Sequence, residues 1–357
     1  MEKEKLDISV VNRFRERVNQ YDLISHIYKN FDGKNKWNVI CSALDWIETC
    51  AEGVDITLLS RDNNSQASIK LITFISCSDV VWEGIQQLHR VLMNTNSIPF
   101  KGDNSVFEKE IDDNAYWKEI RAAFAAHQVN LKGNEGEKKF ASWSGGGFGT
   151  GDFSVILYSN IIDDDRYEFF DIRFSELLEF IDKRYMYLND LMEKIEEVTN
   201  DYCQVWRKKS IAYQETNIQS TLEMLEYENA TRMDIDYFKW RLGEIKQAYT
   251  TNSENKNNQL LLEEYRDALL SEVREIYDVL QNMDFDHEIS GLNEQPEFGY
   301  TYHNQQIFEP QKGLVSWATE GLKKPLGKYI DFDAIDSISE LQVLVRAGWW
   351  KNNSEKM

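Results

Sequence analysis

The segment Phe107–Leu131 has the sequence FEKEIDDNAYWKEIRAAFAAHQVNL and predicts one helix. Trp117, Ile120 and Phe124 recur at intervals of three and four residues, which draws an apolar stripe along one helix face. The acidic and amide side chains at 112–114 suit a helix start, because they accept hydrogen bonds from the first free N–H groups. The segment is therefore expected to be the last helix of an N-terminal bundle.

Three further helices are predicted before it, at 8–30, 36–51 and 67–93, each from apolar residues at helical spacing. The front of the third, Ile69–Ile75, is rich in β-branched residues and also suits a strand, but the length of the segment favours a helix. Four helices in roughly 130 residues are typical of an up-and-down bundle. Residues 1–131 are thus the first predicted domain.

A segment of different character, 132–175, follows the bundle. Its short apolar runs alternate with turn residues and predict a three-stranded antiparallel meander. A glycine-rich link, Gly145–Gly151, separates the first two runs. It lacks the Gly-Lys-Ser/Thr of a P-loop, so a hairpin tip is favoured over a phosphate site. The three runs are Lys138–Trp143, Phe153–Tyr158 and Tyr167–Phe174.

The helical period returns in the segment 176–285, with long stripes at 177–205 and 218–249 and a further helix at 260–280. Long antiparallel helices are expected there, packed as a bundle because no strict heptad is kept. The tail, 286–357, is rich in aromatic residues and predicts short helices. The fold class is therefore expected to be mainly α (α+β): a four-helix bundle, a small antiparallel insert and long C-terminal helices.

Charge is unevenly distributed along the chain, whose net charge is −21. The chain has 40 basic and 61 acidic side chains. Residues 1–130 carry 15 of the basic and 19 of the acidic ones, so residues 131–357 carry the other 25 basic and 42 acidic ones. Such acidity excludes attraction of nucleic acid by the overall field. An RNA substrate would have to meet a local basic cluster, and Arg207, Lys208 and Lys209 form the best candidate.

Cysteine usage and hydropathy indicate the compartment. The four cysteines have no metal-binding spacing, so reduced thiols and a cytoplasmic location are expected. The charged N-terminus lacks the apolar core of a signal peptide, and no apolar run reaches the length of a membrane span. No metal site and no cofactor site is predicted.

Arg121 and His127, separated by five residues, are the best candidates for chemistry. Histidine transfers protons near neutral pH, and the planar guanidinium of arginine holds phosphate. Together they suit metal-free RNA cleavage with the 2′-hydroxyl as nucleophile. Six residues of helix give about 9 Å of rise and about 120° of rotation, so two copies in a symmetric dimer would converge more readily on one phosphate. Spacing also predicts His127 on or beside the apolar stripe.

A structural interpretation of this pair stays open. His127 would cap the C-terminal end of the helix, where the helix dipole favours a cation. Arg121 would pair with Glu108 or with an acid on a neighbouring helix. Neither residue would then meet a substrate.

The arginine and histidine pair on the last helix of a roughly 130-residue four-helix unit resembles the HEPN superfamily. Many members are metal-independent ribonucleases of toxin–antitoxin and antiphage systems. The resemblance covers residues 1–131 and implies a homodimer in which each subunit contributes Arg121 and His127, with RNA, including tRNA, as substrate. One position departs from the pattern: Ala122 stands where such ribonucleases usually have a polar residue.

A second hypothesis belongs to a different class of protein. The net charge of −17 beyond residue 130, the aromatic tail and Ala122 also suit a non-catalytic helical scaffold. Such a protein would bind a protein partner through its acidic surface, for example to regulate a basic effector.

Overall fold

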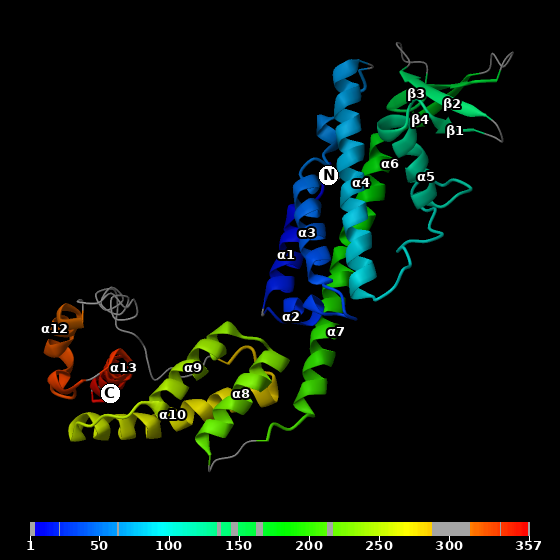
Figure 1. Ribbon diagram of the computed structural model, residues 1–357. Helices are drawn as coiled ribbons and strands as arrows, with labels where there is room; N and C mark the ends of the chain where they lie inside the picture. The colour runs from blue at the N-terminus through cyan, green and yellow to red at the C-terminus, as the bar shows by residue number, and fades with distance from the viewer. Residues whose placement is uncertain are drawn as a thin grey trace. The chain divides into compact units, whose positions relative to one another are not determined.

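The computed structural model describes residues 4–20, 22–62, 64–133, 137–143, 149–161, 167–212, 217–287, 315–335 and 337–355. The chain divides into two compact units, Met1–Asn200 and Asp201–Met357. Both are mainly helical, and the first also contains a small antiparallel sheet, so the predicted fold class is confirmed (Figure 1). The start of the glycine-rich link, the turn at 163–165 and residues 288–314 of the tail lie outside the described residues.

The first unit is built on two antiparallel helices that lie side by side, α3 (Trp37–Ala51) and α4 (Ser65–Leu92) (Figure 1). Helix α4 begins where Asn64 accepts hydrogen bonds from two backbone N–H groups at 3.0 Å, an N-cap that satisfies free donors. The other elements before the sheet are α1 (Ile8–Asn19), α2 (Leu23–Lys29), the 3₁₀ turn η1 (Ile56–Leu58), α5 (Asp113–Arg121) and the π-helical turn η2 (Ala122–Ala126).

The sheet has four strands in sequential order, one more than predicted. They are β1 (Leu131–Lys132), β2 (Lys138–Trp143), β3 (Phe153–Ser159) and β4 (Tyr167–Ile172). Phe153 and Val155 of β3 and Ile172 of β4 are buried and share one core with the helices. Phe124 of η2 packs against Phe170 of β4, with ring centroids 5.4 Å apart. The predicted segments 1–131 and 132–175 therefore belong to one compact unit, which also includes α6 (Phe174–Met186).

The second unit consists of helices, and the unit boundary falls within α7 (Leu188–Arg207). Its centre is a buried ion network: Arg241 donates to Glu272 at 2.6 Å and to Glu244 at 2.8 Å, and Arg346 donates to the other Glu244 oxygen at 2.9 Å. The network joins three helices of this unit. The remaining elements are α8 (Ile218–Arg232), α9 (Asp236–Thr250), α10 (Lys256–Asn282), α12 (Val315–Leu326), the 3₁₀ turn η3 (Phe332–Ala334) and α13 (Ile338–Ser354).

Helices that the stripes predicted as continuous are interrupted at three points. The predicted helix 8–30 breaks before α2, where Asp22 has a left-handed φ of 53°. The stripe at 177–205 is divided at Tyr187, and the stripe at 218–249 is divided before α9. At the last break, the Asn229 side chain bonds both the N–H and the C=O of Ile235, which replaces the helical bonds. Within the described residues, no helix has the length and apolar character needed to cross a membrane.

Candidate functional site

Helix α5 begins at Asp113, not at Phe107 as predicted. The cause is a pair of carboxylates: Asp112 caps the helix by accepting from Ala115 N at 2.8 Å, and Asp113 accepts from the backbone N–H groups of Val106 and Phe107 at 3.1 Å. Asp113 is fully buried, so these bonds hold the preceding loop in a non-helical path. The cap predicted at 112–114 is confirmed for Asp112.

The predicted stripe is confirmed, since Trp117, Ile120 and Phe124 are each at most 1% exposed. The end of the helix differs from the prediction. The residues between Arg121 and His127 form the π-helical turn η2, closed by a 3.0 Å bond from His127 N to Ala122 O. This is an i to i−5 bond, a geometry that is rare and often occurs at functional sites.

His127 lies outside the helix and is exposed, so its predicted position on or beside the buried stripe is wrong. The chain leaves the helix here because its backbone groups bond to the sheet: Gln128 O accepts from Ala141 N at 2.7 Å, and Leu131 pairs with Lys139. Strand pairing therefore replaces the last predicted turn of helix.

Arg121 extends from α5 to α4, where its Nη1 donates to Oδ2 of Asp79 at 2.7 Å. The Arg121 side chain is 41% exposed and the Asp79 side chain 23% exposed. This contact matches the structural alternative in which Arg121 pairs with an acid on a neighbouring helix. The acid is Asp79 and not Glu108. One terminal nitrogen is engaged with Asp79, and the half-exposed guanidinium remains open to solvent.

A groove between α4 and α5 surrounds the Arg121 side chain and has a volume of about 190 Å³. Two further cations, Arg90 and Lys118, line it together with the acids Asp79 and Glu83. We name it the α4–α5 groove. Three cations against two acids make it locally basic in a chain that is strongly acidic overall. Its other lining residues are Trp82, Gln86, Ile98, Asn114 and Trp117.

The wall of this groove is held by Arg184 of α6, which is fully buried. Arg184 donates to Oδ1 of Asn114 at 2.9 and 3.0 Å and lies 3.6 Å from the centre of the Phe180 ring. Burial lowers the pKa of Arg184 to about 10, although nearby aspartates oppose the shift. Asn114 also donates to Phe100 O at 3.1 Å, so its orientation in the groove is determined on both sides.

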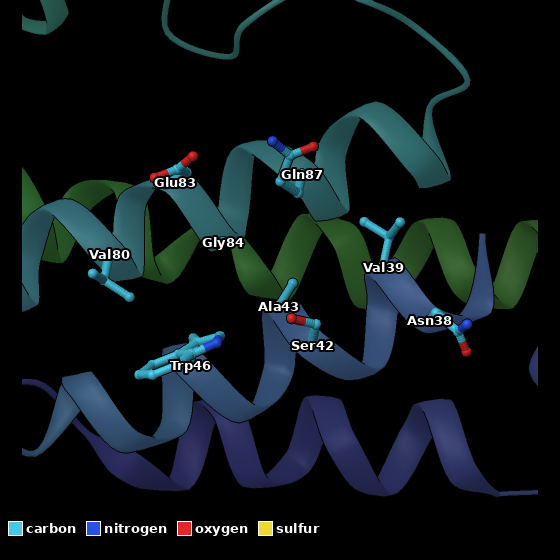
Figure 2. Close-up of a pocket in the computed structure, with 9 residues that line it drawn as sticks. All are labelled: Asn38, Val39, Ser42, Ala43, Trp46, Val80, Glu83, Gly84 and Gln87. Atoms are coloured by element: carbon cyan, nitrogen blue, oxygen red, sulfur yellow. The ribbon is translucent and has the colours of Figure 1, made fainter. Parts of the chain in front are cut away.

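A second groove lies on the neighbouring face of α4, between α3 and α4, and has a volume of about 490 Å³. Figure 2 shows Trp46 of α3 extending toward Val80 of α4, with Ala43 and Gly84 between the two helices. Gly84 permits this close helix approach, because a Cβ built there would lie 2.7 Å from Ile47 Cγ1. We name it the α3–α4 groove; its remaining lining residues are Asn38, Val39, Ser42, Glu83 and Gln87.

The basic cluster Arg207, Lys208 and Lys209 lies at the end of α7, in the second unit, and all three residues are exposed. Arg207 donates from Nε to Asn282 O at 2.6 Å, and Lys209 Nζ lies 3.9 Å from the centre of the Trp206 ring. Two of the three cations therefore also make structural contacts. Their role as RNA contacts stays a prediction.

The sequence did not identify Asp79, Arg90 or Trp46 as neighbours of the site, because helix packing brings them there. Lys118 had a local signal: it lies three residues before Arg121 and therefore on the same face of α5. Among the described residues, no group of three or more His, Cys, Asp or Glu side chains is arranged to hold a metal ion.

No family model, no curated protein and no solved structure matches this chain. The resemblance to HEPN ribonucleases therefore depends on Arg121 and His127 and on the helices before them.

Proposed function

We propose that the protein is a metal-independent endoribonuclease in which Arg121 binds the scissile phosphate and His127 transfers a proton. The observation that carries this proposal is the π-helical turn η2, which spans the five residues between Arg121 and His127 and leaves both side chains accessible. The α4–α5 groove adds Arg90 and Lys118 beside Arg121, which suits an anionic substrate.

The chemistry follows from the two side chains. The 2′-oxygen attacks the adjacent phosphorus, the bond from phosphorus to the 5′-oxygen breaks, and the products are a 2′,3′-cyclic phosphate and a 5′-hydroxyl. The imidazole of His127 accepts the 2′-hydroxyl proton, and the imidazolium formed in this way donates a proton to the leaving 5′-oxygen. The Arg121 guanidinium stabilises the negative charge that develops on the phosphoryl oxygens.

A homodimer is part of this proposal. Arg121 ends α5 and His127 follows the turn η2 outside the helix, so a two-fold axis near this point would allow Arg121 of one copy and His127 of the other to approach one phosphate. The exposed cluster Arg207, Lys208 and Lys209 would add sequence-independent contacts to RNA. We also propose a cytoplasmic location and a role as a toxin or antiviral effector; the four free cysteines suit a reducing compartment.

The test is cleavage of labelled single-stranded RNA and tRNA by purified protein in EDTA. We expect products with 2′,3′-cyclic phosphate ends, and a loss of at least about 100-fold in rate for Arg121→Ala and for His127→Ala. The matched controls are Arg13→Ala and His287→Ala, which remove an exposed arginine and an exposed histidine elsewhere. Variants at 121 and 127 that cut RNA as fast as the wild type would refute the proposal.

A non-catalytic interaction protein is the second candidate, and an exposed aromatic pair on α9 favours it. Tyr237 and Trp240 are 44% and 52% exposed, their ring centroids lie 6.0 Å apart, and the acids Asp234 and Asp236 adjoin them. Aromatic side chains of this kind are enriched at protein interfaces. This candidate predicts a stable protein partner that the wild type captures and Trp240→Ala does not; capture that is unchanged by the substitution would count against it.

A further inference from the structure

The α3–α4 groove has the shape and chemistry of a binding site for a flat apolar ring. Trp46 forms one wall and is 58% exposed although it is a large hydrophobic side chain. Val80 lies opposite, and the buried residues Ala43 and Gly84 form the floor (Figure 2). The volume of about 490 Å³ is within the range of small-ligand sites.

The two grooves lie on adjacent faces of α4 and share Glu83 as a lining residue. One helical step of about 100° separates Asp79 in the α4–α5 groove from Val80 in the α3–α4 groove. A ligand that crosses α4 at this level would therefore meet an apolar aromatic site on one side. On the other side it would meet the cations Arg90, Lys118 and Arg121.

A single-stranded nucleic acid has this alternation of flat rings and anionic groups. Its bases stack on aromatic side chains largely without regard to sequence, and its phosphates follow basic grooves. The polar side chain of Ser42 also lines the α3–α4 groove, and Figure 2 shows it on the side of α3 that faces α4, where it can bond the edge of a base.

The acids beside Trp46 are partly neutralised. Asp45 and Glu48 both accept from the one guanidinium of Arg15 of α1, at 2.9 and 2.7 Å, so this group keeps a net charge of −1 and the attraction at Trp46 has to come from stacking. Glu83 lines both grooves, and Figure 2 shows its carboxylate on the side of α4 that faces away from α3. A strand that crosses α4 therefore passes beside this acid, and its attractive contacts are Trp46 on one side and the three cations on the other.

We infer that the α3–α4 groove binds one base of a single-stranded RNA, stacked on Trp46, while a neighbouring phosphate lies in the α4–α5 groove beside Arg121. This inference rests on the proposed ribonuclease function and names the part of the substrate that the enzyme holds next to the cleavage site. It assigns a positioning role to Trp46, which touches the substrate away from the reacting atoms.

The experiment measures the affinity of a fluorescent single-stranded RNA by anisotropy in EDTA, with His127→Ala in every protein to prevent cleavage. We expect Trp46→Ala to weaken binding roughly tenfold and Trp46→Phe to retain most of it, because phenylalanine still stacks. The control Tyr227→Ala removes an exposed aromatic side chain of the other unit and should leave the affinity unchanged. Circular dichroism and Tm establish that each variant is folded.

An abasic oligomer of the same length separates stacking from charge. It should bind the Trp46→Ala variant and its parent equally, since it has phosphates and no bases. An equal affinity of the Trp46→Ala variant and its parent for RNA that has its bases would overturn the inference. So would a Trp46→Ala variant that changes the oligomeric state in sedimentation and leaves RNA affinity unchanged, because the groove would then hold a second copy of the chain.

The outcomes also separate this inference from the ribonuclease itself. Cleavage of RNA by the wild type with full activity in Trp46→Ala would leave the ribonuclease standing and refute the base site. Binding through Trp46 without any cleavage would support the base site and refute the ribonuclease. A protein that binds neither single-stranded RNA nor tRNA refutes both.

Discussion

Arg121 on α5 and Asp79 on α4 are joined by a 2.7 Å hydrogen bond from Nη1 to Oδ2, at the edge of a groove that also contains Arg90 and Lys118. The bond determines the direction of the guanidinium and leaves it partly exposed. Because the pair is not buried, we expect its effect on stability to be small. Its main effect is then to orient the Arg121 guanidinium toward a ligand in the groove.

Removing Asp79 tests this relationship. For the proposed ribonuclease, we expect Asp79→Ala to lower kcat for RNA cleavage about tenfold, because a freely rotating arginine would be aligned less often with the phosphate. The free energy of unfolding should change by less than about 1 kcal/mol, as for other partly exposed ion pairs. Steady-state kinetics and urea denaturation measure the two effects. The control is Glu48→Ala, which removes a carboxylate bound to Arg15. An Asp79→Ala enzyme that cleaves RNA faster than the wild type would contradict this prediction and indicate that Asp79 obstructs the phosphate site.

Gly84 and Gly243 form a matched pair of helical glycines with opposite expected effects. A Cβ at Gly84 would lie 2.7 Å from Ile47 Cγ1 and 3.3 Å from Ala43 O, so Gly84→Ala should lower the free energy of unfolding by about 1–3 kcal/mol through overpacking. No atom lies within 4 Å of a Cβ at Gly243, so Gly243→Ala should raise it by up to about 1 kcal/mol through helix propensity. Urea denaturation measures the free energy of unfolding of both variants. Changes of the same sign would contradict the packing argument.

For the buried Arg241–Glu272 pair of the second unit, we expect a large loss of stability when one partner is removed. Glu272 is 1% exposed, so Arg241→Met leaves a buried carboxylate without this cation and should destabilise the second unit by about 3–5 kcal/mol. The double variant Arg241→Met/Glu272→Leu should recover much of the loss, because neither charge remains buried alone. Lys239→Ala, which removes a half-exposed cation from α9, is the control and should have an effect below about 1 kcal/mol. A double variant less stable than Arg241→Met would contradict this account.

His89 predicts a pH dependence of stability in the first unit. Burial and the nearby Arg90 lower the pKa of His89, whose ring bonds the Tyr187 hydroxyl at 2.8 Å and faces Ser97 Oγ at 3.3 Å. A lowered pKa in the folded state gives stability that is present above the unfolded pKa of about 6.5 and is lost as the pH falls below it. The Tm should therefore decrease from pH 7.5 to 5.5, and His89→Gln should reduce that decrease. A variant with the same Tm difference as the wild type would exclude His89 as a cause.

Several features of the fold depend on local sequence alone, and these were predicted correctly. The stripe of Trp117, Ile120 and Phe124 is buried because residues at this spacing share one helix face whatever packs against it. The Asp112 cap is equally local, since its carboxylate bonds a backbone N–H three residues ahead. The run Tyr167–Phe174 was predicted as a strand from its alternation of apolar and polar residues, and it contains β4.

The interruptions of the helices were not predicted, because each depends on bonds that the helical pattern does not encode. Asn229 replaces helical bonds at Ile235, and the pairing of Leu131 with Lys139 draws the chain out of the helix after His127. An apolar stripe continues across such breaks, so periodicity alone joins the two helices on either side. The exposed position of His127 follows from the second of these breaks.

The sequence by itself determined a mainly helical chain with a small sheet, and it singled out Arg121 and His127 as the best candidates for chemistry. Only the tertiary structure decided what surrounds them. Asp79 and Arg90 are some 30 to 40 residues from Arg121 in the chain, and Trp46 is farther still. They meet at adjacent faces of α4 because Gly84 allows α3 to approach closely and because Asp113 anchors the loop before α5. Local periodicity specifies which face of a helix is buried, whereas helix packing specifies which side chains meet across it.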